Sequence, residues 1–150
     1  MYTTDYRELK LQAEALVAEV PHFIANLANL SALLYQTMEA INWAGFYLAE
    51  QNLLVLGPFQ GKTACIEIPF GKGVCGTAAL RDTPLLVEDV HQFAGHIACD
   101  SASRSEIVIP FHRDGKVAGV LDIDSPVLTR FSKEDLEGLS GIVKILEKTL

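Results

Sequence analysis

Three cysteines are the residues of this chain best suited to chemistry. Cys65, Cys75 and Cys99 are separated by 10 and 24 positions. An odd number does not suit a static disulfide framework, and in a reducing compartment a cysteine serves as a buried apolar residue, a metal ligand or a redox group. Because the buried, inert cysteine is the commonest of these, the surroundings of each cysteine must decide.

A hairpin near the C-terminus determines where three acidic side chains lie. Strand-like segments at 106–112 and 116–124 meet at Asp114-Gly115. A two-residue turn there would mix apolar and acidic side chains on each face of the hairpin. A three-residue loop at 114–116 instead places the apolar side chains on one face and the acidic ones on the other, and the hydrophobic pattern decides the register of a hairpin. We therefore expect the loop, which pairs Glu106 with Asp124 and Val108 with Asp122. The apolar residues then share one face: Ile107, Ile109, Phe111, Val117, Leu121 and Ile123.

The other face of this hairpin gathers the carboxylates of Glu106, Asp122 and Asp124. Carboxylates so close repel one another unless a proton, a cation or a metal joins them. Their repulsion raises the pKa of at least one member, so the cluster can donate a proton near neutrality or hold an ammonium group. The alternative is a solvated polar face, which is common in antiparallel sheets.

Composition limits the partners and the location. The 150 residues, 49% of them hydrophobic, predict one domain at 1–150 with a sizeable core. The net charge of -7, with no cluster of basic and aromatic residues, argues against nucleic acid and anionic membranes. The apolar runs are too short to cross a bilayer and the N-terminus lacks a signal-peptide pattern, so we expect a cytoplasmic protein without a membrane contact.

The remaining pattern predicts an α+β fold. Helical periodicity marks segments 5–20 and 23–34, and a third helix begins at a cap formed by Ser132. Between them we expect six strands in a mostly antiparallel sheet, at 41–48, 53–60, 63–68, 85–88, 106–112 and 116–124. The glycines of GKGVCGTA match a phosphate loop poorly, and they indicate a tight turn into a short helix that bears Cys75.

Five sequence motifs carry a family resemblance: INWAGFYL, LVLGPFQGKTAC, GKGVCGTAA, GHIACDSASRSEIVIP and GVLDIDS. Together, in unbroken order over nearly the whole chain, they resemble the GAF-domain free methionine-R-sulfoxide reductases. The resemblance implies a GAF-like fold in which the N- and C-terminal helices pack on one face of a six-stranded sheet. Loops and short helices form a pocket on the other face.

The same resemblance implies a thiol-dependent reduction of free L-methionine-(R)-S-oxide. Cys99 would be the nucleophile, Cys75 its resolving partner and Cys65 an additional thiol that exchanges disulfides. A sulfenic acid on Cys99 would condense with a neighbouring thiol, and thioredoxin would reopen the disulfide, consuming NADPH only indirectly. No bound cofactor and no metal are expected.

Further residues are assigned to substrate binding by resemblance. Glu106, Asp122 and Asp124 would line the pocket, and Trp43 and Tyr47 would form an apolar wall around the methyl end of the substrate. The aromatic pair has a simpler interpretation, because 43 and 47 share a strand face and aromatics there usually fill a core. A homodimer through the terminal helices fits the fold, although the apolar stripes of these helices could equally lie inside one subunit.

Two alternatives compete with a reductase. A non-catalytic GAF module that senses a small ligand is the first, although no output domain is attached and such a pocket would not call for three carboxylates with three thiols. A zinc site from Cys65, Cys75, Cys99 and His96 is the second, but paired Cys-x-x-Cys knuckles are absent. His96 and Arg104 could instead favour a thiolate on Cys99, although a surface or hydrogen-bonding role is the simpler one for His96.

Overall fold

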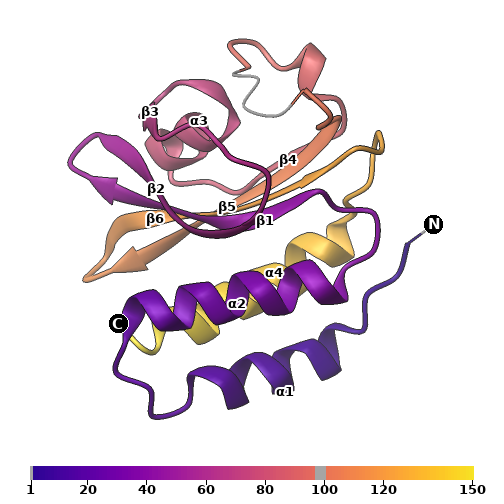
Figure 1. The fold of residues 1–150 in the computed structure, drawn as a ribbon. Coiled ribbons are helices and arrows are strands. Elements are labelled where there is room, and N and C mark those ends of the chain that lie inside the picture. Colours follow the sequence, from indigo (N-terminus) through magenta and orange to yellow (C-terminus); the bar gives the residue numbers. More distant parts are fainter. Residues whose placement is uncertain (1, 97–100) are drawn as a thin grey trace.

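A six-stranded sheet divides the molecule into two sides (Figure 1). The computed structural model describes residues 2–96 and 101–150. The helices are α1 (Tyr6–Val17), α2 (Phe23–Thr37), α3 (Gly73–Arg81) and α4 (Lys133–Glu147), with a 3₁₀ turn η1 (Val90–Gln92). The strands are β1 (Trp43–Glu50), β2 (Leu53–Gly61), β3 (Glu67–Pro69), β4 (Leu85–Val87), β5 (Ser105–Arg113) and β6 (Lys116–Ser125). Their order is β3-β2-β1-β6-β5-β4, and neighbouring strands run antiparallel.

The terminal helices cover one side of the sheet, as expected. Figure 1 shows α2 and α4 against the sheet and α1 beyond them. The apolar stripes read from the sequence form this core: Leu9 and Ala13 of α1, Leu27 and Leu34 of α2, and Leu139 of α4 are all almost fully buried. α1 packs on α4 and α2, so its stripe is covered by helices rather than by strands.

Capping explains where two of these helices begin. The Asp5 side chain accepts a hydrogen bond from the backbone N–H of Glu8 at the start of α1. Ser132 and Asp135 form a reciprocal capping box at the start of α4, which confirms the predicted cap. The carboxylate of Asp135 also accepts hydrogen bonds from Tyr6 and Arg130, so this helix start ties α1 to α4.

The β5–β6 hairpin has the expected register at its base and a different turn at its tip. Glu106 pairs with Asp124, as predicted. The three-residue loop is wrong, because Asp114 and Gly115 form a two-residue turn with positive φ at both positions. A β-bulge at Ala118 on β6 supplies the extra residue.

The bulge also changes the face of the hairpin on which one apolar residue lies, so the prediction for that residue is wrong. Val117 was expected to share a face with the other apolar residues of the hairpin, but it packs with the cluster on the pocket side. Ala118 packs with the helix-side cluster instead. Past the bulge the predicted alternation holds, so Ile107, Leu121 and Ile123 face the helices. The acidic residues consequently face the other way.

The pocket side is built from α3, the short edge strands and the connecting loops (Figure 1). The predicted strand at 63–68 is confined to β3, because residues 62–66 run without strand pairing. α3 is the short helix expected after the glycine-rich turn. Within residues 2–96 and 101–150, no helix has both the length and the apolar character that crossing a bilayer requires.

Candidate active site

A pocket lies between α3 and the face of the sheet opposite α2 and α4. Its cavity volume is about 50 Å³. Its floor comes from the central strands β1, β5 and β6, and its rim comes from the loops after β2 and before β5. The pocket combines apolar and aromatic lining with a few polar groups that the sheet supplies, as small-molecule sites do.

Glu106, Asp122 and Asp124 all line this pocket. Glu106 stands on β5 directly opposite Asp124 on β6, and Asp122 lies two residues earlier on the same face of β6. Glu106 is 7% exposed and Asp122 5%, while Asp124 is half-buried. The hairpin therefore brings the three predicted carboxylates together in a confined space rather than on a solvated face.

Burial and mutual repulsion keep a proton within this cluster. Burial, followed by the charges of Asp124 and Glu106, raises the pKa of Asp122 well above its usual range. Burial also raises the pKa of Glu106, against hydrogen bonds with Asp122 and Cys75 that favour its ionised form. The geometry thus favours a protonated Asp122 that donates to Glu106, and Asp122 Oδ1 has no hydrogen-bond partner in the described part of the chain.

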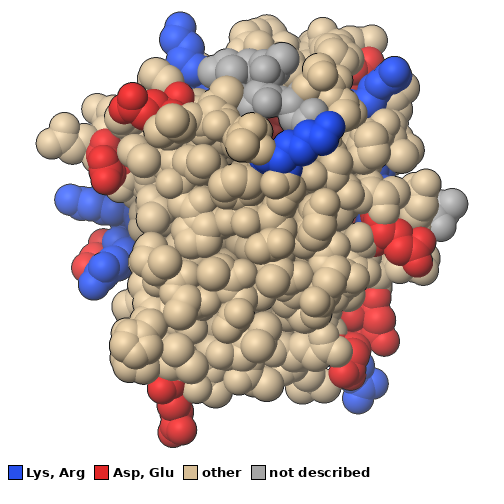
Figure 2. Space-filling model, in the orientation of Figure 1, with Lys and Arg blue, Asp and Glu red and all other residues tan. Residues whose placement is uncertain are grey.

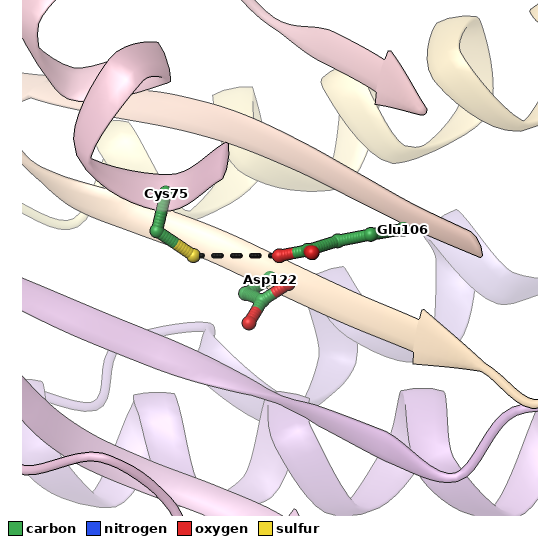
Figure 3. A group of neighbouring side chains, drawn as sticks. All are labelled: Cys75, Glu106 and Asp122. Carbon is green, nitrogen blue, oxygen red and sulfur yellow. Dashed lines mark hydrogen bonds between the residues drawn. The ribbon is translucent and has the colours of Figure 1, made fainter. Parts of the chain in front are cut away.

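Cys75 lies in the first turn of α3 and points at this cluster (Figure 3). Its thiol donates a hydrogen bond to Glu106 Oε2 at 3.6 Å. Burial, followed by the charges of Asp122 and Glu106, raises the pKa of the Cys75 thiol, so this cysteine is a neutral thiol near pH 7. Cys75 is a free cysteine, whereas the half-buried Cys65 is disulfide-bonded.

Trp43 and Tyr47 form a wall of the pocket from β1. Their rings stack with centroids 5.9 Å apart. Trp43 Nε1 donates to the Lys62 carbonyl at 3.1 Å, and the Tyr47 hydroxyl donates to the Cys65 carbonyl at 2.9 Å. The pair is both core and pocket wall, and its polar atoms fix the segment that carries Cys65.

Comparisons with known proteins agree with this architecture. A family model described as GAF domain matches residues 14–150. Free methionine-R-sulfoxide reductase of Escherichia coli (strain K12) is 56% identical over 148 residues, which are 99% of this chain and 90% of that protein. The chain belongs to the GAF-domain free methionine-R-sulfoxide reductase family.

Solved structures of this family superpose closely on the chain. The reduced form of fRMsr of Staphylococcus aureus has a TM-score of 0.97 and 56% identity, covering 100% of this chain and 98% of that one. Free methionine-R-sulfoxide reductase from Neisseria meningitidis, in complex with its substrate, has a TM-score of 0.93 and 47% identity, covering 96% of this chain and 87% of that one.

The GAF-domain reductase fold also brings residues to the pocket that the sequence did not single out. Lys72 and Ser103 line it beside the predicted residues. His96, which the sequence offered as a zinc ligand or a thiolate-stabilising group, also lines it, and its pKa is lowered by burial and by His91. The glycine-rich segment predicted the turn into α3, but it could not show that the N-terminus of this helix faces the carboxylates.

The remaining predicted residues of this reductase-family chain are Arg104 and the nucleophile that it could stabilise. Arg104 is exposed and is absent from the described pocket lining. Cys99, the predicted nucleophile, lies outside the described residues. Its neighbours in sequence, His96 and Ser103, are the described pocket-lining residues on either side of it.

Proposed function

We propose that this chain reduces free methionine-(R)-sulfoxide to methionine, with Cys99 as the attacking thiolate. The observation that carries the proposal is the buried carboxylate cluster, which retains a proton beside an aromatic wall. A sulfoxide needs both features, because its oxygen must be protonated while its methyl group occupies an apolar surface. Family membership makes the chain an oxidoreductase, and the chemistry of the pocket is suited to this reaction.

The proposed reaction is a two-electron reduction. The Cys99 thiolate attacks the sulfoxide sulfur while the Asp122–Glu106 pair donates a proton to the sulfoxide oxygen. The attack forms a sulfur–sulfur bond and turns the sulfoxide oxygen into a hydroxyl group. Transfer of this hydroxyl to the Cys99 sulfur breaks the substrate's sulfur–oxygen bond and the new sulfur–sulfur bond, so methionine leaves and Cys99 becomes a sulfenic acid. A second thiol then attacks this sulfur, which releases water and leaves a disulfide. Two thiols are thereby oxidised for each sulfoxide reduced.

We assign the substrate's charged ends to opposite sides of the pocket. Asp124, half-buried beside the protonated pair, is placed to hold the ammonium group together with Glu106. Lys72 and the N-terminal N–H groups of α3 lie across the pocket from the sheet and suit the carboxylate. A peptide-bound methionine lacks both charges, so this arrangement favours the free amino acid.

The cysteines differ in a way that supports separate roles in recycling. Cys75 is buried and is a free thiol, whereas Cys65 is half-buried and takes part in a disulfide. Cys65 is therefore the easier of the two for an external dithiol protein to reach. We propose that Cys75 and Cys65 relay the disulfide and that thioredoxin reopens it, so NADPH is used only indirectly. The reaction would then take place in the cytoplasm and need no cofactor bound to the chain.

A homodimer is part of the proposal and is supported by the surface of α2. This helix has no charged residue among its 15 positions, and Ile24 and Tyr35 are 57% and 39% exposed. Figure 2 shows a broad central area without Lys, Arg, Asp or Glu where α2 lies in Figure 1. An uncharged face of this kind suits pairing with a second copy.

The deciding experiment is a turnover by the protein's own thiols. Fully reduced protein is incubated with each separated epimer of free methionine sulfoxide, without external reductant, and methionine and thiols are counted. We expect methionine from the R epimer with the loss of two thiols for each methionine formed, and neither change in Cys99→Ser. Cys65→Ser and Cys75→Ser separately identify the second thiol.

The opposite result would point to the other class of GAF module. If neither epimer yields methionine although the protein is folded and reduced, the reductase proposal fails. Binding of methionine sulfoxide without turnover would then favour a ligand-sensing module, whose cysteines would require another explanation.

A further inference from the structure

Cys75, Glu106 and Asp122 form a compact set of three buried side chains that are all potential metal ligands. One ligand atom from each lies within 4.8 Å of the other two. They come from three different elements, α3, β5 and β6, and Figure 3 shows them converging on one point. A thiol and two carboxylates are donors that zinc accepts in proteins.

An independent feature of Asp122 points to a missing partner. Its Oδ1 atom is buried and has no hydrogen-bond partner in the described part of the chain, although the side chain is only 5% exposed. Buried polar atoms of this kind are rare in folded proteins and call for an explanation such as a bound ion. Asp122 also lines the pocket, so the side chain borders a space that a ligand can enter.

The spacing of two of the donors suits a tetrahedral ion. With a metal–sulfur bond of about 2.3 Å and a metal–oxygen bond of about 2.1 Å, a tetrahedral angle separates the two donors by roughly 3.6 Å. The Cys75 Sγ and Glu106 Oε2 atoms are 3.6 Å apart. A metal ion can therefore bind both of these atoms in place of the thiol proton with little change in the distance between them, and Asp122, whose donor lies within 4.8 Å of both, would be the third ligand.

We propose that Cys75, Glu106 and Asp122 bind a thiophilic divalent cation such as Zn²⁺ or Cd²⁺, with the fourth coordination position open to the pocket. Binding replaces the thiol proton, which is released to solvent. The sulfur donor favours Zn²⁺ and Cd²⁺ over Mg²⁺ and Ca²⁺, which prefer oxygen ligands. This ion is not a participant in the proposed reaction, because it occupies the carboxylates that the reaction needs.

This ligand set differs from the zinc site considered from the sequence. That site required Cys65, Cys75, Cys99 and His96, but Cys65 is disulfide-bonded and Cys99 lies outside the described residues. The carboxylates replace those ligands. If the chain has the proposed function, Zn²⁺ bound here inhibits it competitively with the sulfoxide. The binding of the ion itself does not rest on the proposed function.

The test uses a protein in which Cys75 is the only cysteine. In the full-length Cys65→Ser/Cys99→Ser variant, a Cd²⁺ titration is followed through the ultraviolet thiolate-to-cadmium charge-transfer band. We expect saturation at one ion per chain, and loss of the band when Zn²⁺ but not excess Mg²⁺ is added. Free methionine, which would occupy the same pocket, should lower the apparent affinity.

Further variants in this background identify the carboxylate ligands. Asp122→Asn and Glu106→Gln should each weaken Cd²⁺ binding by about tenfold or more, since even outer-shell changes cost that much at metal sites. Glu67→Gln, which removes an exposed carboxylate on β3, is the matched control and should leave the affinity unchanged. Circular dichroism checks that each variant is folded.

Two results would overturn the inference. They are the absence of a charge-transfer band in the folded protein, and a Cd²⁺ affinity that neither carboxylate variant alters. These readouts need no turnover, so Cd²⁺ binding in a protein that releases no methionine would refute the proposed function and leave the metal site standing.

Discussion

Replacing Asp122 by asparagine separates a chemical role for this carboxyl from a structural one. Asparagine keeps the size of the side chain and can still donate a hydrogen bond to Glu106, but it cannot transfer a proton. We expect single-turnover formation of methionine to fall by about 10²–10⁴-fold, the usual contribution of a general acid. The wild-type rate should also decline as the pH rises through the raised pKa of Asp122, and the variant should lose that decline.

Asp122→Asn should lower the activity but should not lower the stability of the fold. Burial raises the pKa of Asp122 in the folded state, so over the interval between its unfolded and folded pKa values folding takes up a proton. Across that interval this residue lowers the free energy of unfolding by about 1.4 kcal/mol for each unit of pH increase. Asparagine has no such penalty, so the variant should be at least as stable as the wild type at pH 7.

Two measurements on the same samples check this reasoning. Quenched-flow or timed single turnovers across pH give the rate profile, and urea unfolding at acidic and neutral pH gives the stability. Glu67→Gln serves as the control for removing one negative charge from an exposed position of the sheet. An unchanged rate profile in Asp122→Asn would refute the proton-donor role, and a loss of both activity and stability would assign the residue a structural one.

Three other changes have defined outcomes. Tyr47→Phe leaves the carbonyl of the loop after β2 without its buried donor, so we expect about 1–3 kcal/mol lower stability by urea unfolding and weaker substrate binding by calorimetry. Although burial opposes it, hydrogen bonding to Asp82 and Glu147 raises the pKa of His112. His112→Gln should therefore lower the free energy of unfolding by about 0.5–1 kcal/mol below pH 6, after allowance for solvent screening, and by progressively less as the pH rises through that pKa. Equal losses of melting temperature at pH 5.5 and 9 would contradict this. Ile24→Glu should convert the proposed homodimer into a folded monomer by light scattering, and an unchanged dimer mass would place the interface elsewhere.

The β5–β6 hairpin illustrates how far sequence patterning reaches. Alternation of apolar and acidic residues predicted the pairing of Glu106 with Asp124 because one face had to be buried. The Asp114-Gly115 dipeptide independently predicted a two-residue turn. The two signals conflict unless one strand carries an additional residue, and the bulge at Ala118 reconciles them. A bulge has no strong sequence signal of its own, so the turn and the face of Val117 were assigned incorrectly.

Some residues of the site could likewise be predicted from the sequence and others could not. The acidic face followed from strand alternation within one local hairpin, and so did the shared face of Trp43 and Tyr47. The approach of Cys75 to Glu106 spans 31 positions and depends on how α3 settles on the sheet, which no periodicity encodes. Lys72 and Ser103 were missed for the same reason, because each lies in an irregular segment beside an element rather than within a patterned one.

The bulge at Ala118 determines where this hairpin can change its length during evolution. Removing Ala118 would leave Val117 opposite His112 and Gly119 opposite Phe111, so strand pairing would become continuous while the acidic base stayed in place. A deletion between Gly119 and Asp122 would instead shift that part of β6 by one position and turn its carboxylate toward the helices. Insertions and deletions should therefore be tolerated from the bulge to the tip and excluded on the strand segment that leads to the acidic residues.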